Sequence, residues 1–146
     1  MKYFIASDHT GVELKTYVKN ILEKLNHTVI DLGPNTNDRV DYPDFAKKVC
    51  QNIIENKNTK GILICGSGIG MSMSANKFKG IRAALCHNQY SAKMAIEHNN
   101  ANILCLGQRV NAYAMIEEII LSWNNAKFQE GRHTNRIAKI DNITNK

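Results

Sequence analysis

The chain lacks several features that would assign it at once to a class. Its 146 residues contain no apolar run near the roughly 18 residues of a membrane-spanning helix. No signal-peptide pattern opens the sequence, because the N-terminus enters a predicted strand directly. We therefore expect a cytoplasmic protein without a membrane partner. The length suits one domain over 1–146 with a core of its own.

Paired metal ligands are also missing. None of the four cysteines is spaced from another as Cys-x-x-Cys, which excludes a zinc ribbon and a thioredoxin motif. Cys50, Cys86 and Cys105 fall within apolar helical or strand-like segments, as small buried hydrophobic residues do. The histidines are scattered, and Asp8-His9 is the only adjacent Asp/His pair, so we expect no metal.

The net charge of +6 is not concentrated as a nucleic-acid-binding surface requires. Many lysines, such as Lys15 and Lys19, lie along helical stretches as solvated faces. Basic residues cluster only at Arg132, His133 and Arg136, with Arg109 elsewhere. Because arginine matches phosphate oxygens in bidentate fashion, this cluster indicates a small phosphorylated ligand and no nucleic acid.

Apolar strand-like segments and amphipathic helical segments alternate five times. Strands are expected at 3–6, 28–32, 61–65, 81–86 and 103–106, and helices at 12–22, 42–55, 71–78, 89–97 and 112–123. Wholly apolar strands that alternate with helices predict a parallel sheet covered on both faces. We predict a single-domain α/β protein with a Rossmann-like, doubly wound, five-stranded parallel sheet and a C-terminal helical tail.

Ligands of such sheets bind beyond the carboxyl ends of the strands. We expect the chemistry-bearing side chains to lie in or near the loops at that edge. These side chains are Asp8, His9, Cys65, Ser67, His87, His98, Asn99 and Arg109.

The strand expected at 61–65 ends in Cys65 and enters the segment Gly66-Ser67-Gly68-Ile69-Gly70. Glycines let consecutive backbone N–H groups converge on one point, and the following helix adds the positive end of its dipole. A thiol there is expected to ionise more readily than a free cysteine. The segment predicts a reactive thiol beside an anion-binding loop.

Common glycine-rich motifs do not fit this segment. A dinucleotide fingerprint needs a third glycine where Met71 stands, and a P-loop needs lysine where Met71-Ser72 follow the last glycine. A hydrolase elbow needs glycine in place of Cys65. A thiol-dependent phosphatase needs an arginine shortly after the cysteine, and the next one is Arg82.

The segment 127–146 breaks the alternation. It is polar, with Ile137, Ile140 and Ile143 at three-residue spacing beside the basic cluster. Spacing alone leaves two interpretations open: a frayed terminus, or a helical tail that delivers its basic groups into the site of a partner subunit.

Five ordered motifs together resemble one family, over about 1–140. They are Ser7-Asp8-His9-Thr10-Gly11, Asp41-Tyr42-Pro43, Cys65-Gly66-Ser67-Gly68-Ile69-Gly70, Glu97-His98-Asn99-Asn100-Ala101-Asn102 and Arg132-His133-Thr134-Asn135-Arg136. The set is similar to the type B ribose-5-phosphate isomerases, which are related to the galactose-6-phosphate isomerase subunits.

This resemblance implies a cofactor-independent interconversion of ribose 5-phosphate and ribulose 5-phosphate through a cis-enediolate. Cys65 would be the proton-transferring base, His98 the acid–base that opens the furanose ring, and Ser67 a donor to the developing oxyanion. Another branch of the family resembles this one but uses a glutamate directly after the loop. Met71 stands there and cannot take a proton, which favours Cys65.

The resemblance also implies the binding residues. The sugar would contact Asp8, Tyr42, Asn99 and the loop Gly66, Ser67, Gly68, Ile69 and Gly70; the phosphate would be held by His9, Arg109, Arg132 and Arg136, with His133 close by. The tail would act in a homodimer with shared active sites, which can pair further into a tetramer. His98 as a helix cap and Tyr42 as a surface aromatic stay open as alternatives.

Three other functions remain to be weighed. A six-carbon aldose phosphate, galactose 6-phosphate or allose 6-phosphate, would need only one more carbon between loop and arginines. A non-enzymatic sugar-phosphate-binding module would share the fold, since fold alone does not imply chemistry. A thiol redox sensor would need Cys86 or Cys105 to lie near Cys65 in space.

Overall fold

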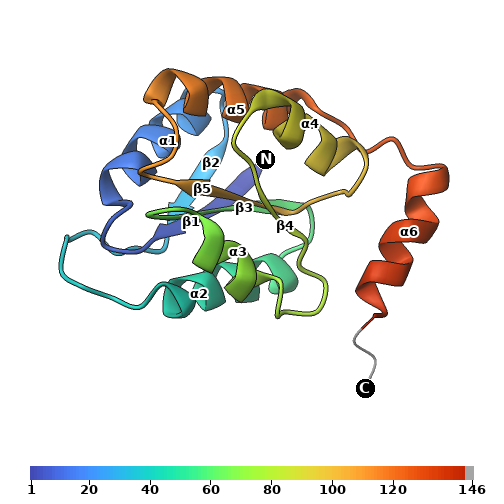
Figure 1. Ribbon diagram of the computed structural model, residues 1–146, viewed down its shortest axis with the longest axis horizontal. Coiled ribbons are helices and arrows are strands. Elements are labelled where there is room, and N and C mark those ends of the chain that lie inside the picture. Colours follow the sequence, from blue (N-terminus) through green and yellow to red (C-terminus); the bar gives the residue numbers. More distant parts are fainter. Residues whose placement is uncertain (144–146) are drawn as a thin grey trace.

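The computed structural model describes residues 1–143, which form one parallel sheet with helices on both faces (Figure 1). The strands are β1 (Lys2–Ser7), β2 (Thr28–Asp31), β3 (Thr59–Cys65), β4 (Ala83–Leu85) and β5 (Ile103–Gly107). The helices are α1 (Val12–Lys24), α2 (Tyr42–Glu55), α3 (Ile69–Ala75), α4 (Gln89–Glu97), α5 (Tyr113–Asn125) and α6 (Arg132–Asp141). The predicted fold class is confirmed.

The strands pair in the order β2-β1-β3-β5-β4, and every pairing is parallel. The chain winds outward from β1 to β2, then crosses over β1 to reach β3. Ser7 at the end of β1 therefore pairs with Ile64, and Cys65 at the end of β3 pairs with Gly107. This register brings the ends of β1, β3 and β5 together at one edge of the sheet.

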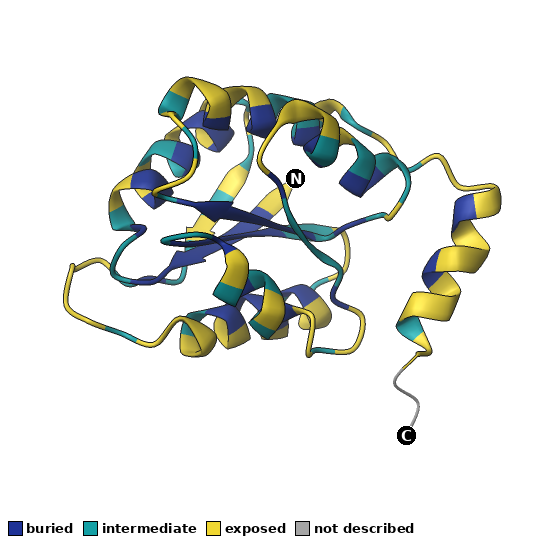
Figure 2. Ribbon diagram, in the orientation of Figure 1, coloured by how far each residue is buried: buried dark blue, intermediate teal, exposed yellow. Residues whose placement is uncertain are grey.

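Two apolar cores lie on the two faces of the sheet. Helices α1, α4 and α5 cover one face, where Leu14 and Trp123 are wholly buried. Helices α2 and α3 cover the other, around Val49 and Met71. The central strands β1, β3 and β5 are largely buried between the two layers, whereas the edge strands β2 and β4 are exposed or half-buried. The outer faces of the helices are exposed (Figure 2). Burial on both sides is why the central strands lack alternation.

Every predicted boundary lies within three residues of the observed one, and two of the differences have an evident cause in the structure. The strand expected at 81–86 shortens to Ala83–Leu85, because β4 is an edge strand with β5 as its one partner. The helix expected at 71–78 spans Ile69–Ala75, since Gly68 takes a left-handed conformation that starts the helix earlier. Of the isoleucines at three-residue spacing in the tail, the first two lie in α6. The last residues of the tail, 144–146, lie outside the described part of the chain.

The two ends of the strands carry different elements. In Figure 1 the strands run toward the left, where the loops after β1, β3 and β5 lie, and α6 stands apart on the right. Helix α4 runs back from the carboxyl edge to the amino edge, as a crossover helix must. Neither apolar core includes a residue of α6.

Candidate active site

A cleft opens between the ends of β1 and β3, where neighbouring strands send their helices to opposite faces. Such a switch point is the usual ligand site of an open α/β sheet. The cleft has a volume of about 580 Å³. It is lined by Asp8, Thr10, Tyr42, Cys65, Gly66, Ser67, Ile69, Gly70, Met73, Arg109 and Val110.

Cys65 forms the floor of this cleft. Its side chain belongs to the core below α3 and is 4% exposed. Its Sγ accepts a hydrogen bond from the backbone N–H of Gly68 at 3.1 Å. The carbonyl of Cys65 accepts from the N–H of Gln108 at 2.9 Å, which fixes the strand end against β5. Together these hydrogen bonds hold the Cys65 thiol in place at the end of β3.

The loop after Cys65 requires a glycine at position 68. Gly68 has φ 79°, and a Cβ there would lie 2.5 Å from Leu85 Cδ1 and 2.9 Å from the backbone of Leu106. This close approach aims the Gly68 N–H at the thiol. The N–H of Ile69 donates to Ser67 Oγ at 3.2 Å. The hydroxyl proton of Ser67 can thus still donate into the cleft.

Asp8 follows β1 and faces Cys65 across the cleft, 6% exposed. Its Oδ1 accepts two hydrogen bonds from Thr10, one from the hydroxyl at 2.6 Å and one from the backbone N–H at 2.9 Å. Both hydrogen bonds use the same carboxylate oxygen, so the other oxygen keeps its acceptor capacity for a ligand.

Aromatic and basic side chains border the cleft. Tyr42, 40% exposed at the start of α2, packs its ring against Gly70, where a Cβ would lie 2.6 Å from Tyr42 Cζ. The guanidinium of Arg109 lies beside Gly66, and its backbone N–H donates to the Gly66 carbonyl at 3.0 Å. His9 follows Asp8 but is not among the residues that line the cleft; its Nδ1 accepts from the N–H of Val40 at 3.3 Å.

The other three cysteines are buried, and burial disfavours their thiolate forms. Burial raises the pKa of Cys50 to about 12 and that of Cys86 to about 11. Burial also raises the pKa of Cys105, and Cys65, Cys50 and Cys86 raise it further. All four cysteines are free thiols. The expectation that Cys50, Cys86 and Cys105 are small buried residues is confirmed.

The other predicted site residues form a second group, which we call the basic cluster: His98, Arg132, His133 and Arg136. The rings of His98 and His133 stack, with centroids 4.4 Å apart and planes at 13°. Burial lowers the pKa of His133, and the nearby His98, Arg132 and Arg136 lower it further. Arg132 and Arg136 are both exposed.

The basic cluster does not lie in the cleft. His98 caps the carboxyl end of α4, where its N–H donates to the Met94 carbonyl, so it sits at the amino edge of the sheet. Asn99, next to it, lines a different cavity of about 740 Å³ between β4, α4 and α6. The expectation that His98 and Asn99 lie in loops at the carboxyl edge is wrong, because a helix between two parallel strands ends at the opposite edge.

The sequence reasoning missed Thr10 and Gln108. Thr10 lies inside the motif that was singled out for Asp8, but nothing in the sequence showed that its hydroxyl meets the carboxylate. The Gln108 Oε1 accepts from the Leu14 N–H at 2.9 Å and so ties the start of α1 to the end of β5. The Thr10 contact is local, since an aspartate commonly accepts from the residue two positions on. The Gln108 contact joins residues distant in sequence, so only the fold reveals it.

Two further observations concern the described residues alone. Residues 1–143 bring no three or more His, Cys, Asp or Glu side chains together in a way that could hold a metal ion. No helix within the same range is long and apolar enough to cross a bilayer.

Fold and cleft together define a doubly wound α/β protein with a thiol and an amide-rich loop at its switch point. Residues 3–140 match the family model described as Ribose/Galactose Isomerase. Ribose-5-phosphate isomerase B of Escherichia coli strain K12 is 38% identical over 142 residues, which is 97% of this chain and 95% of that protein. A Bacillus subtilis relative, 46% identical over 147 residues (100% and 99%), is named only by the broader class of sugar phosphate isomerase.

Solved structures of the same family match this chain over nearly its whole length. The ribose-5-phosphate isomerase B of Clostridium thermocellum matches with a TM-score of 0.95 at 48% identity, covering 98% of this chain and 97% of that one. The enzyme of Mycoplasma genitalium, solved with bound ribulose-5-phosphate, matches with a TM-score of 0.93 at 43% identity, covering 97% and 95%.

The chain belongs to the ribose/galactose isomerase family, and the resemblance to the type B ribose-5-phosphate isomerases is confirmed. The protein is an isomerase.

Proposed function

We propose that this isomerase interconverts ribose 5-phosphate and ribulose 5-phosphate through a cis-enediolate, without a cofactor, with Cys65 as the base. The observation that carries the proposal is the Gly68 amide directed at the Cys65 thiol on the floor of the cleft. The Mycoplasma genitalium relative binds ribulose-5-phosphate, which supports a pentose phosphate as ligand.

In this mechanism the Cys65 thiolate removes the proton from C2 of the open-chain aldose. Electrons move into the C1 carbonyl, and the resulting enediolate has oxygens on C1 and C2. The hydroxyl proton on O2 passes to O1, so that C2 becomes the carbonyl carbon. Cys65 returns its proton to C1 to give the ketose, so one group serves both transfers at carbon. A base that serves both transfers works best when its pKa lies near the operating pH.

The developing oxyanion needs donors that are already in place. The Ser67 hydroxyl and the remaining amides of the loop, those of Gly66, Ser67 and Gly70, would supply them. Losing one such donor typically costs about 3 kcal/mol in the barrier. Asp8, fixed by Thr10, would accept hydrogen bonds from sugar hydroxyls, and Tyr42 would close the cleft over the sugar.

We further propose that the active site is completed by a second copy of the chain. Within one chain, Cys65 lies at the carboxyl edge of the sheet and His98 at the amino edge, so the base and the ring-opening group serve different sites. In a homodimer, His98, Asn99, Arg132, His133 and Arg136 of one subunit would face the cleft of the other. Arg109, from within the cleft, and His9, from the loop after β1, would meet the same phosphate. A tetramer would be a pair of such dimers.

The segment 127–146 is then a functional tail and not a frayed terminus. A helix that is tied to its own chain by a histidine stack presents two exposed arginines four residues apart, which suit a phosphate on another molecule. The four free thiols suit the reducing cytoplasm, where we place the enzyme.

The test is the rate of ketose formation from ribose 5-phosphate by the wild type and by Cys65→Ala, with Cys86→Ala as the matched control. General-base catalysis contributes roughly 10²–10⁴-fold, so Cys65→Ala should lose at least that factor in kcat while Cys86→Ala stays within a few-fold of the wild type. Equal kcat in Cys65→Ala and the wild type would remove Cys65 as the base.

A six-carbon aldose phosphate is the second candidate, favoured by the family description, which includes galactose isomerases. Galactose 6-phosphate and allose 6-phosphate should therefore be assayed alongside ribose 5-phosphate. Faster turnover of a hexose phosphate would replace the pentose assignment. Tight ribose 5-phosphate binding without turnover of any of the three would favour a non-enzymatic binding module.

A redox role for Cys65 is disfavoured by the strand register. Cys105 pairs with Leu63, two residues from Cys65, so the two cysteines are diagonal neighbours on adjacent strands. The spacing between strands and the rise along a strand place the Cα atoms of such neighbours about 8 Å apart, beyond the usual reach of a disulfide. Disulfide formation between them on peroxide treatment, seen by mass spectrometry, would contradict this.

A further inference from the structure

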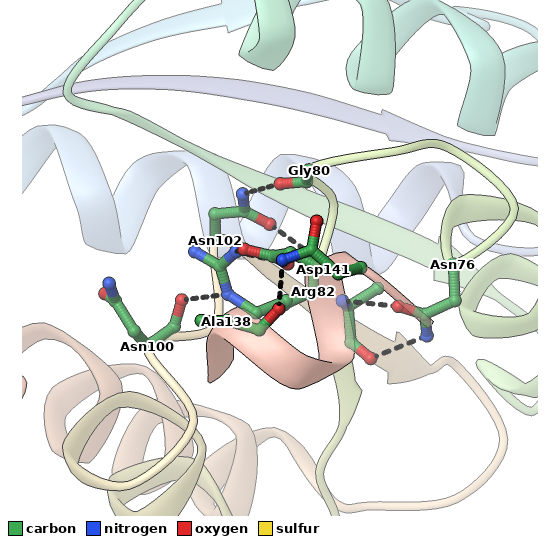
Figure 3. Close-up of polar contacts among 9 residues, drawn as sticks. Asn76, Gly80, Arg82, Asn100, Asn102, Ala138 and Asp141 are labelled. Atoms are coloured by element: carbon green, nitrogen blue, oxygen red, sulfur yellow. Dashed lines mark hydrogen bonds and ion pairs between the residues drawn. The ribbon is translucent and has the colours of Figure 1, made fainter. Parts of the chain in front are cut away.

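We infer that Arg82 and Asp141 are positioning residues for the basic cluster, an inference that rests on the proposed function of that cluster in phosphate binding. Arg82 lies just before β4 and reaches two separate elements (Figure 3). Its NH1 bonds both carboxylate oxygens of Asp141 at 3.0 Å, in the last turn of α6. Its Nε donates to the carbonyl of Asn100 at 3.0 Å.

Arg82, with its contacts to Asp141 and to the Asn100 carbonyl, forms a clamp between two segments. The segment that contains Asn100 is itself held in place. The N–H of Arg82 donates to Asn102 Oδ1 at 2.8 Å, and Asn102 Nδ2 donates to the Gly80 carbonyl at 2.8 Å (Figure 3). His98 lies two residues before Asn100. Arg82 therefore connects the segment that carries His98 to the helix that carries His133.

The clamp also determines which way α6 faces. His133, Ile137 and Asp141 are spaced by four residues and so lie on one side of the helix, with His133 and Ile137 buried. This side is attached at its first turn by the His98 stack and at its last turn by Arg82. Arg132 and Arg136 belong to the neighbouring side, which is left exposed. A rotation of α6 would misalign both arginines.

The position of Asp141 is otherwise unfavourable. A carboxylate in the last turn of a helix meets the negative end of the helix dipole. Arg82 supplies the opposite charge, and the pair is partly shielded, with side chains 17% and 34% exposed. Because α6 belongs to neither apolar core, few other contacts fix its direction.

The test uses Asp141→Asn, which keeps the size of the side chain and removes its charge. Glu55→Gln is the matched control, since it removes one exposed acid from the last turn of α2 and changes the net charge equally. We expect Asp141→Asn to raise KM for ribose 5-phosphate roughly fivefold, with a smaller change in kcat, because phosphate binding acts on ground and transition states alike. Asp141→Glu should recover most of the loss.

Hydrogen exchange over 132–141 provides a readout independent of turnover. Exchange in α6 should accelerate in Asp141→Asn and stay unchanged in Glu55→Gln. Faster exchange without turnover of ribose 5-phosphate by the wild type would disprove the proposed substrate and leave the clamp standing. Unchanged exchange, or unchanged KM in an Asp141→Asn enzyme whose wild type is active, would overturn the positioning role.

Discussion

The cleft around Cys65 and the basic cluster are built in opposite ways. The cleft is defined by backbone: strand ends, a left-handed glycine and amides held by the β3–β5 register. The basic cluster is defined by side chains, one at the end of α4 and three on the peripheral helix α6, and a ring stack and an ion pair attach α6 to the rest of the chain. The proposed base, Cys65, is therefore held rigidly by backbone. The proposed phosphate-binding arginines depend on the position of α6 and on a partner subunit.

The sharpest way to test this division is to inactivate each region in a different chain. Cys65→Ala alone and Arg132→Ala/Arg136→Ala alone should each be nearly inactive. Co-expression should regenerate one intact site per heterodimer, and hence about a quarter of the wild-type activity for random pairing. Cys65→Ala co-expressed with Cys65→Ser is the control and should stay inactive. Failure of the first pair to complement would mean that both regions act within one chain.

Within α6 we expect the arginines to matter and a neighbouring lysine not to. Arg136→Ala should raise KM about 10- to 100-fold, because it removes a charge-assisted hydrogen bond to phosphate. Lys139→Ala removes the same charge from the same helix, from another exposed position, and should leave KM within about twofold. Steady-state kinetics on ribose 5-phosphate decide between them. Equal effects of both variants would reduce the role of α6 to general electrostatic attraction.

In the cleft, a single methyl group should be enough to disturb Tyr42. Gly70→Ala places a Cβ 2.6 Å from the ring, so Tyr42 must swing away from its present position. We expect KM to rise a few-fold and the fold to persist, because Tyr42 is exposed. Tyr42→Ala combined with Gly70→Ala should cause no further loss beyond Tyr42→Ala alone. Additive losses in the double variant would show that Gly70 acts through another contact.

The smallest effect concerns pH at the His98–His133 stack. The folded state lowers the pKa of His133 below its ordinary value of 6.5, so the unfolded chain binds more protons in the window just below 6.5. The neutral form of His133 therefore costs no stability above pH 6.5. The free energy of unfolding falls as the pH drops below 6.5, because the unfolded chain binds the proton more readily. Thermal unfolding between pH 8 and 5 should therefore be less pH-dependent in His133→Gln than in the wild type. An NMR titration that gives His133 a pKa above 6.5 would contradict this.

Much of the fold follows from local pattern. Apolar strands that alternate with amphipathic helices predict a parallel doubly wound sheet, because such strands are stable only when covered on both faces. The strand end at Cys65 and the glycines after it were predictable for the same reason. The early start of α3 was not, since it depends on contacts of Gly68 with Leu85 and Leu106, from other strands.

The sequence by itself determined the fold class, the family and the chemical identity of the candidate groups. The tertiary structure decided which of those groups contact one another. The predicted helix at 89–97 already implies that His98, at its end, lies at the edge opposite Cys65. Only the tertiary structure shows that His98 stacks there on His133 and that Arg82 pairs with Asp141. Ring stacks and ion pairs between distant residues depend on distance in space and not on spacing in sequence.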